Sequence, residues 1–200
     1  RVASRGLGDV YKRQPNDLAL FETNKIIQNL SDLYPNYFWT PRITFGGLLD
    51  TPNEDGDTKE QGPVFGIGID FHSKTSRQIE IWELEKYLLH GNLPKNTNDA
   101  LISTKLAKQL SVNVGSTVTL ISTTMDNAFT TYNFEITGIF NLNKGQVDRQ
   151  MMLVDISGAR QALGMEGAAS EILGYHQSLY YNDNEATSCL LYTSPSPRDA

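Results

Sequence analysis

The chain is nearly free of cysteine: its single cysteine, Cys189, lies close to the end of the 200 residues. One thiol cannot close an intramolecular disulfide, and it cannot supply a multi-cysteine metal site. The sequence also has no apolar run near the 18 or so residues that a membrane helix needs. These absences exclude a disulfide framework, a cysteine-based metal centre and a membrane span within this sequence.

Cations are in the minority. The chain has 17 Lys+Arg against 23 Asp+Glu, a formal net charge of −6. A nucleic-acid surface needs clustered cations to replace the counterions of the phosphates, and an anionic membrane surface attracts polybasic segments. We therefore expect no nucleic-acid partner. The length suits one ordinary domain or two small lobes.

The two ends share one feature. Residues 4–14 read SRGLGDVYKRQ and residues 189–199 read CLLYTSPSPRD. A DNA sequence that encodes the first also encodes the second when its opposite strand is read in another frame. This element resembles the transposon-end adapter used to prepare sequencing libraries, so residues 1–14 and 189–200 are excluded as non-natural. The natural segment, 15–188, has 12 Lys+Arg and 21 Asp+Glu, net −9. We expect it to be an internal, metagenomic fragment of a longer gene.

Hydrophobic periodicity predicts a mixed α/β (α+β) fold. The segment 151–156 carries apolar residues on both faces, which predicts a strand in the middle of a core. The polar run 51–63 predicts a solvated hairpin tip or a mobile loop. The alternative is an acidic metal loop, but the run lacks the spacing of a calcium loop. Helices are predicted at 17–33 with Asp17 as N-cap, at 81–88 with Gly91 at the C′ position, at 103–110 and at 157–163. Strands are predicted at 37–49, 64–71, 100–102, 117–122, 132–140, 151–156 and 170–181.

The stretch 101–120, LISTKLAKQLSVNVGSTVTL, has the clearest local signals. Ser103 is placed to cap a helix whose Leu106, Ala107 and Leu110 face the core. Gly115 supplies a backbone geometry that a β-carbon would strain, and it returns the chain to a strand.

Residues that could carry chemistry are few. The histidines His72, His90 and His176 lie on separate elements without metal-ligand spacing. Asp70, Asp99 and Asp148 could include a hydrolytic pair, but a turn or capping role explains each more simply.

The glycine pair Gly66 and Gly68 lacks the third glycine and the helix of a dinucleotide fingerprint, so close backbone packing is the better interpretation. The sequence has no nucleophile elbow and no Walker loop. We therefore expect no catalytic activity, no cofactor and no metal.

An ordered series of short motifs does resemble a known family. It comprises Leu106-Ala107, Leu110, Val112, Gly115, Val118 and Leu120, then Phe134-Glu135-Ile136-Thr137-Gly138-Ile139-Phe140, Asp148, Leu153-Val154-Asp155-Ile156 and Ala159-Arg160. The upstream strands TPRITFGGLL and VFGIGIDF fit the same pattern. The series resembles the extracytoplasmic (MacB-like periplasmic core) domain of FtsX-like ABC-transporter permeases, the group of MacB-type exporters and the LolC and LolE lipoprotein-release permeases.

The resemblance implies a two-lobed domain, with one strand-helix-strand lobe and a smaller β-rich lobe at about 92–165. It implies a place on the periplasmic side of the bacterial inner membrane and a role in transport or lipoprotein release by conformational change. The implied partners are an ABC ATPase that hydrolyses ATP in the cytoplasm, a second permease in a dimer, and a periplasmic protein.

In the LolC branch a hairpin between the two central strands recruits a carrier. The matching tip here, 123–131, is short and has no arginine. We therefore expect no LolC-like carrier hook, and we treat Met125, Asp126, Asn127 and Phe129 as a candidate partner-contact loop.

Two other classes stay open at this point. Leu-x-Val-x-x-Gly-x-x-Val-x-Leu also occurs in double-psi barrels, which would make the chain a soluble small-barrel module that binds a ligand or peptide. That barrel needs a second copy of the motif, which the sequence does not show. A secreted hydrolase is the third class, and no nucleophile and base can be named for it.

Overall fold

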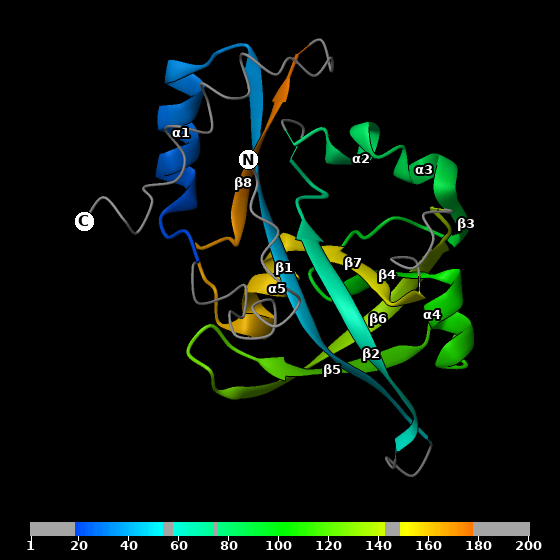
Figure 1. The fold of residues 1–200 in the computed structure, drawn as a ribbon. Helices are drawn as coiled ribbons and strands as arrows, with labels where there is room; N and C mark the ends of the chain where they lie inside the picture. Colours follow the sequence, from blue (N-terminus) through cyan, green and yellow to red (C-terminus); the bar gives the residue numbers. More distant parts are fainter. Residues whose placement is uncertain (1–18, 54–57, 74–75, 143–148, 178–200) are drawn as a thin grey trace, which may run out of the picture.

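The computed structural model describes residues 19–53, 58–73, 76–142 and 149–177 (Figure 1). Helices and strands are mixed along the chain, which confirms the predicted α/β class. The adapter-like ends 1–14 and 189–200 lie outside the described residues, as does Asp148. The elements are α1 (Thr23–Leu33), β1 (Tyr37–Pro52), β2 (Thr58–Ile69), α2 (Gln78–Ile81), α3 (Leu84–Tyr87), β3 (Leu88–Gly91), β4 (Asp99–Ser103), α4 (Thr104–Gln109), β5 (Thr117–Thr123), β6 (Phe129–Phe140), β7 (Met151–Asp155), α5 (Ile156–Leu163) and β8 (Glu171–His176).

Six strands close into a ring in the order β1-β2-β7-β4-β6-β5 and back to β1. The β2–β7 and β4–β6 pairs are parallel and the other four are antiparallel. A short ladder between 48–50 of β1 and 119–121 of β5 completes the closure. The ring combines two strands that precede residue 92, β1 and β2, with four that follow it. Residue 92 is where the resemblance implies that the smaller β-rich lobe begins. Closure leaves the ring with no free edge, which is how small barrels avoid strand-to-strand aggregation.

Two short strands extend the ring. β3 pairs with the end of β6, and β8 pairs with the first half of β1, where Arg42 and Glu171 form a 2.8 Å ion pair. α1 packs beside β8 and this half of β1, around the buried Leu30 and Trp39 (Figure 1). The long β1–β2 hairpin projects from the body at its far end.

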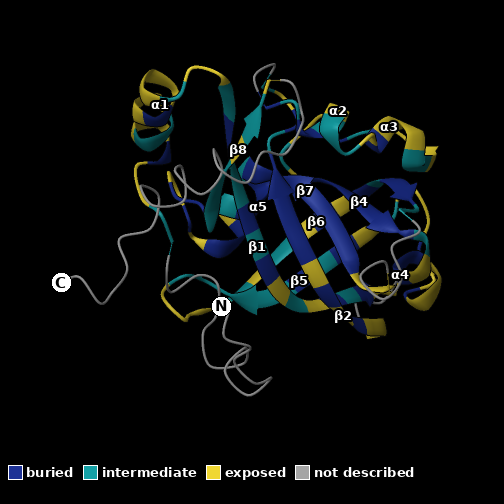
Figure 2. Ribbon diagram, turned by 45° about the horizontal axis from the view of Figure 1, so that its top comes forward, coloured by how far each residue is buried: buried dark blue, intermediate teal, exposed yellow. Residues whose placement is uncertain are grey.

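The main core fills the ring. It draws buried side chains from all six strands and from α4 and α5, which close over it. A second, smaller core lies on the outer side of β2, β7 and β4, under α3. β7 serves both: Met152 and Val154 enter the first core, and Met151 and Leu153 enter the second. All five β7 residues are buried (Figure 2), which confirms the strand predicted to be covered on both faces.

Three predicted elements differ in the structure. α1 begins at Thr23 after Glu22, which is left-handed at φ 52°, and the predicted cap Asp17 lies outside the described residues. The predicted helix at 81–88 is instead two four-residue helices, because Glu83 between them is left-handed at φ 50°. The predicted C′ glycine, Gly91, instead ends β3, which hydrogen-bonds to β6.

The polar hairpin tip is shorter than predicted. β1 continues to Pro52 and β2 begins at Thr58, because Asp50 pairs with Gln61 and Thr51 with Glu60. Inter-strand hydrogen bonds join backbone groups and need no apolar side chains, so the polar composition of this run concealed the strand ends.

Candidate functional site

The residues of the family-like series are mostly packing residues. Gly115 forms an exposed turn at φ +90°, as predicted. Phe140 lies in the second core, and Gly138 is buried where β6 meets β3 and β4. Seven further members are buried in the main core: Leu106, Ala107, Leu110, Val112, Val118, Leu120 and Phe134. The series therefore marks how the ring is closed and capped.

The predicted cap at Ser103 is present. Its hydroxyl accepts a hydrogen bond from the backbone N–H of Leu106 at 3.2 Å, and Ser103 is almost fully buried. The backbone N–H of Gly115 donates to the carbonyl of Ile136 at 2.7 Å. The first bond begins α4 directly after Ser103, as predicted, and the second ties the turn at Gly115 to β6.

The candidate contact loop between β5 and β6 is a closed, ordered turn. Thr124 N–H donates to the Ala128 carbonyl at 2.8 Å, and Asn127 is left-handed at φ 59°. Met125 packs against the main core and donates its N–H to Leu163 at 3.0 Å. Phe129, in contrast, is 73% exposed. The loop therefore divides into an anchor at Met125 and a presented aromatic side chain at Phe129.

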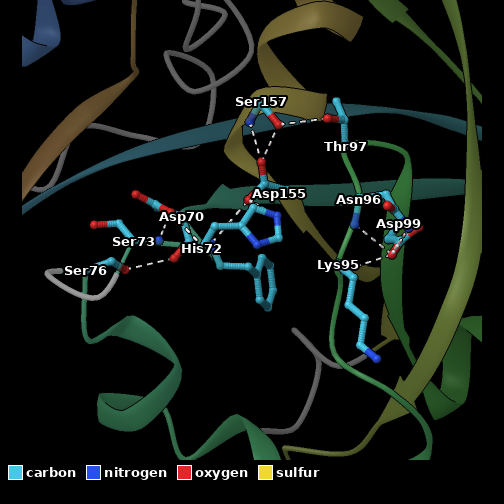
Figure 3. Close-up of polar contacts among 11 residues, drawn as sticks. Asp70, His72, Ser73, Ser76, Lys95, Asn96, Thr97, Asp99, Asp155 and Ser157 are labelled. Atoms are coloured by element: carbon cyan, nitrogen blue, oxygen red, sulfur yellow. Dashed lines mark hydrogen bonds and ion pairs between the residues drawn. The ribbon is translucent and has the colours of Figure 1, made fainter.

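A polar cluster lies at the carboxyl ends of the parallel strands β2 and β7 (Figure 3). Asp155 ends β7 and is 2% exposed. Its carboxylate accepts from Phe71 N–H at 3.2 Å and from Ser157 N–H at 2.9 Å, and it also bonds the Ser157 hydroxyl. His72 Nε2 lies 3.6 Å from the same carboxylate. Asp155 thereby caps α5 and holds the turn that follows β2.

Two further carboxylates stand nearby. Asp70 accepts from the backbone N–H groups of His72 at 3.0 Å and Ser73 at 2.7 Å. Asp99 accepts from Lys95 N–H at 2.8 Å and Asn96 N–H at 3.0 Å. Both are turn groups, as the sequence analysis favoured over a hydrolytic pair.

The cluster holds three segments together. The Ser157 hydroxyl lies 3.3 Å from the Thr97 hydroxyl, which joins α5 to the turn before β4. The same Ser157 hydroxyl also bonds Asp155 at the end of β7. The arrangement is suited to fixing the ends of strands.

Arg160 links α5 to its surroundings. It donates through Nε to the carbonyl of Ala168 at 3.0 Å and through Nη2 to the Thr23 hydroxyl at 3.1 Å. Desolvation by burial lowers the pKa of Arg160, and the nearby charges of Asp70 and Asp155 oppose that shift. The guanidinium therefore joins α1, α5 and the 165–169 turn.

A polar hollow of about 470 Å³ lies between the turn after β2 and the helices α2 and α3. Arg77 on its rim donates to both carboxylate oxygens of Glu80, which lowers the pKa of Glu80. Gln78 on its wall is fully buried, and among the described residues its Nε2 has no hydrogen-bond partner. Sequence reasoning gave no signal for this hollow.

No group of three or more His, Cys, Asp or Glu suited to a metal ion occurs within the described ranges. In the same part of the chain, no helix is long and apolar enough to cross a membrane. The three histidines lie on separate elements: His72 in the turn after β2, His90 in β3 and His176 in β8.

Asp155 is the functional side chain whose role the sequence analysis did not predict. It appeared there only as one member of the family-like series. An acidic residue directly between an apolar strand and a helix is an N-cap signal, and that signal would have identified it.

The architecture defines an α/β domain built on a closed six-stranded ring with helical caps. No family model matches the sequence, and no curated protein matches it either. Nineteen chains of solved structures match the fold. One is the crystal structure of the periplasmic region of MacB from Actinobacillus actinomycetemcomitans. Its TM-score is 0.55 at 17% identity, over 93% of this chain and 77% of that chain. The chain therefore has the same kind of fold as the periplasmic region of MacB.

Proposed function

We propose that this chain is the extracytoplasmic domain of an ABC-transporter permease of the FtsX-like group. The observation that carries the proposal is the structural match to the MacB periplasmic region across 93% of the chain. The ordered motif series supports it, because its buried members are the residues that close and cap the ring. The motif series and the structural match therefore both support the proposal.

In this proposal the domain works mechanically and not as a catalyst. A cytoplasmic ABC ATPase drives the membrane part, and the domain passes that movement to a substrate or a periplasmic partner. A permease would act as a dimer at the inner membrane, with this segment on the periplasmic side. The bonds of Asp155 and Arg160 favour a domain that moves as one body, because they join separate segments to α5. The transported substrate, including lipoprotein, is left open.

The second candidate is a soluble small-barrel module that binds a ligand or peptide. The closed six-stranded ring favours it. Against it, core residues of all six strands fill the ring, and the two hollows lined by described residues lie outside it, near α2 and α3. The MacB-like match gives the permease the stronger support.

Sequencing the native gene outward from both ends of residues 15–188 tests the proposal. We expect an apolar run of about 20 residues upstream, further membrane segments downstream and an adjacent ATPase gene. An intact reading frame without membrane segments would reject the permease and leave the barrel module.

A further inference from the structure

A second hollow adjoins the polar one, between the outer side of the ring and the helices α2 and α3. Its volume is about 360 Å³. Ile67 of β2 and Met151 of β7 line it from the sheet, and both are buried in the second core. Trp82, between α2 and α3, and Leu142, after β6, line it as well and pack against the same core. Apolar side chains from four parts of the chain therefore form its walls, and we call it the apolar hollow.

Arg42 lines the apolar hollow from β1. It lies two residues before Thr44, which pairs with Ile67, so Arg42 and Ile67 face the same outer side of the ring. Its Nε donates to Glu171 at 2.8 Å, and its side chain is 23% exposed. Among the described residues its two Nη groups have no hydrogen-bond partner, and neither is fully buried. The Nη edge of the guanidinium is therefore free, and this edge can hold a carboxylate through two parallel hydrogen bonds.

The other polar side chains of the apolar hollow are mainly donors. The indole N–H of Trp82 and the hydroxyl of Tyr87 also lack a hydrogen-bond partner in the described part of the chain, and neither is fully buried. Glu83 is the one carboxylate among the described lining residues, and the Lys86 ammonium holds its two oxygens at 3.1 and 3.2 Å. Apolar walls with a few unpaired donors are typical of small-molecule sites.

The charges around the apolar hollow nearly cancel. Three ion pairs each match one cation with one carboxylate: Arg42–Glu171, Lys86–Glu83 and Arg77–Glu80. Beyond these pairs, Asp70 and Glu85 line the polar hollow, and the exposed Arg149 lies two residues before Met151. The wider surroundings therefore neither attract nor exclude an anion strongly. The choice of ligand depends on the groups that line the apolar hollow.

We propose that the apolar hollow is a binding site for a small amphiphilic carboxylate. Its apolar body would contact Ile67, Trp82 and Met151, and its carboxylate would accept hydrogen bonds from the Nη groups of Arg42. An anion is favoured because the unpaired groups are donors and the guanidinium is always charged. The volume is near the lower end of the roughly 300–1,000 Å³ of such sites, which suits a medium-length acyl chain or one aromatic ring. The inference goes beyond the permease proposal and does not depend on it.

The test compares three probes that share one apolar body and differ in the head group: octanoate, octanamide and octylamine. The 200-residue chain is labelled with ¹⁵N, and the fluorescence of Trp82 gives a second readout. We expect octanoate to bind with a Kd of about 1 mM or tighter, octanamide to bind at least about tenfold more weakly, and octylamine not to bind. Octanoate should shift the backbone amide signals of residues 42, 67, 81–87, 142 and 151.

Two variants of the Arg42–Glu171 pair separate binding from structure. Arg42→Gln should weaken octanoate binding about tenfold or more and leave octanamide almost unaffected. Glu171→Gln keeps the size of the side chain and removes the competing carboxylate, so it should strengthen octanoate binding. A purely structural role of the pair would weaken binding in both variants. Arg77→Gln is the matched control: Arg77 is 25% exposed and also paired with a glutamate, but it lines the polar hollow, so affinity should not change.

Four results would overturn the proposal. Octanoate could fail to bind at millimolar concentration, octanamide or octylamine could bind as tightly, the amide shifts could map elsewhere, or Arg42→Gln and Arg77→Gln could have equal effects. Octanoate binding in a protein whose gene lacks membrane segments would reject only the permease. A permease gene without octanoate binding would reject only this site.

Discussion

The ring of Phe45 occupies the space that a side chain at Gly66 would take, directly across the β1–β2 ladder. Phe45 is 1% exposed and belongs to the main core. Gly68 has the same role two residues later, where a β-carbon would lie 2.7 Å from that of Ala159 in α5. Both glycines let β2 approach bulky neighbours closely, which confirms the packing interpretation and leaves no role for a phosphate loop.

Gly66→Ala should destabilise the protein by about 1–3 kcal/mol, because the added methyl group must displace the Phe45 ring. Urea unfolding followed by circular dichroism measures the change. Gly46→Ala is the matched control on the neighbouring strand, since its β-carbon meets only open space, and it should change stability by less than about 0.5 kcal/mol. Adding Phe45→Leu to Gly66→Ala should recover part of the loss. Equal effects of the two glycine substitutions would contradict the packing account.

Asp155→Ala should cost about 3 kcal/mol of unfolding free energy. The substitution removes the cap of α5, worth about 0.5–2 kcal/mol. It also leaves the buried Phe71 N–H without its acceptor, at a cost of about 1–3 kcal/mol. Denaturant unfolding measures the loss, with the exposed Asp126→Ala as the control that should be neutral. A loss below about 0.5 kcal/mol would show that the cluster at β2 and β7 does not hold these segments.

The β5–β6 loop should respond unequally to two substitutions. Met125→Ala should destabilise by about 1–2 kcal/mol, less than the roughly 2–5 kcal/mol of a fully buried methionine, because Met125 is only half-buried. Phe129→Ala should stay within about 0.5 kcal/mol of the parent, because the ring is exposed. Thermal unfolding compares the two. A larger loss in Phe129→Ala would show that the ring packs in solution and is not presented to a partner.

Tyr132 should make stability fall in alkaline solution. Desolvation by burial raises the pKa of its phenol, so the folded state favours the neutral form more than the unfolded state does. The contribution of Tyr132 to the free energy of unfolding is therefore complete below about pH 10, the pKa of the phenol in the unfolded chain. It is lost as the pH rises from there through the higher pKa of the folded state. The hydroxyl also lies 2.8 Å from Gln161 Oε1 and 2.5 Å from Asn98 Oδ1, and ionisation removes its proton.

Urea midpoints between pH 8 and pH 11 or so test this dependence. Tyr132→Phe should be slightly less stable at pH 8, because it lacks the hydrogen bond that the single hydroxyl proton donates, and its midpoint should fall less steeply above about pH 10. Since Tyr132 is partly exposed, the difference in slope should be small but of this sign. Parallel curves for the two proteins would contradict the assigned cause.

Local signals predicted the best-formed parts of the fold. The cap at Ser103, the turn at Gly115 and the doubly buried β7 need only neighbouring residues and periodicity, and all three are present. The turn roles of Asp70 and Asp99 were predicted for the same reason. The continuous helix at 81–88 was wrong because left-handed Glu83 and the pairing of β3 with β6 override helical spacing.

The sequence by itself determined which segments form helices and strands and which of their faces are apolar, because side-chain periodicity and caps are local properties of the chain. Tertiary structure decided that β1 pairs with β5 to close the ring and that Asp155 joins the turn after β2 to the start of α5. These relationships join residues far apart in sequence. Their stability comes from contacts that exist only after the chain has folded, so no single segment encodes them.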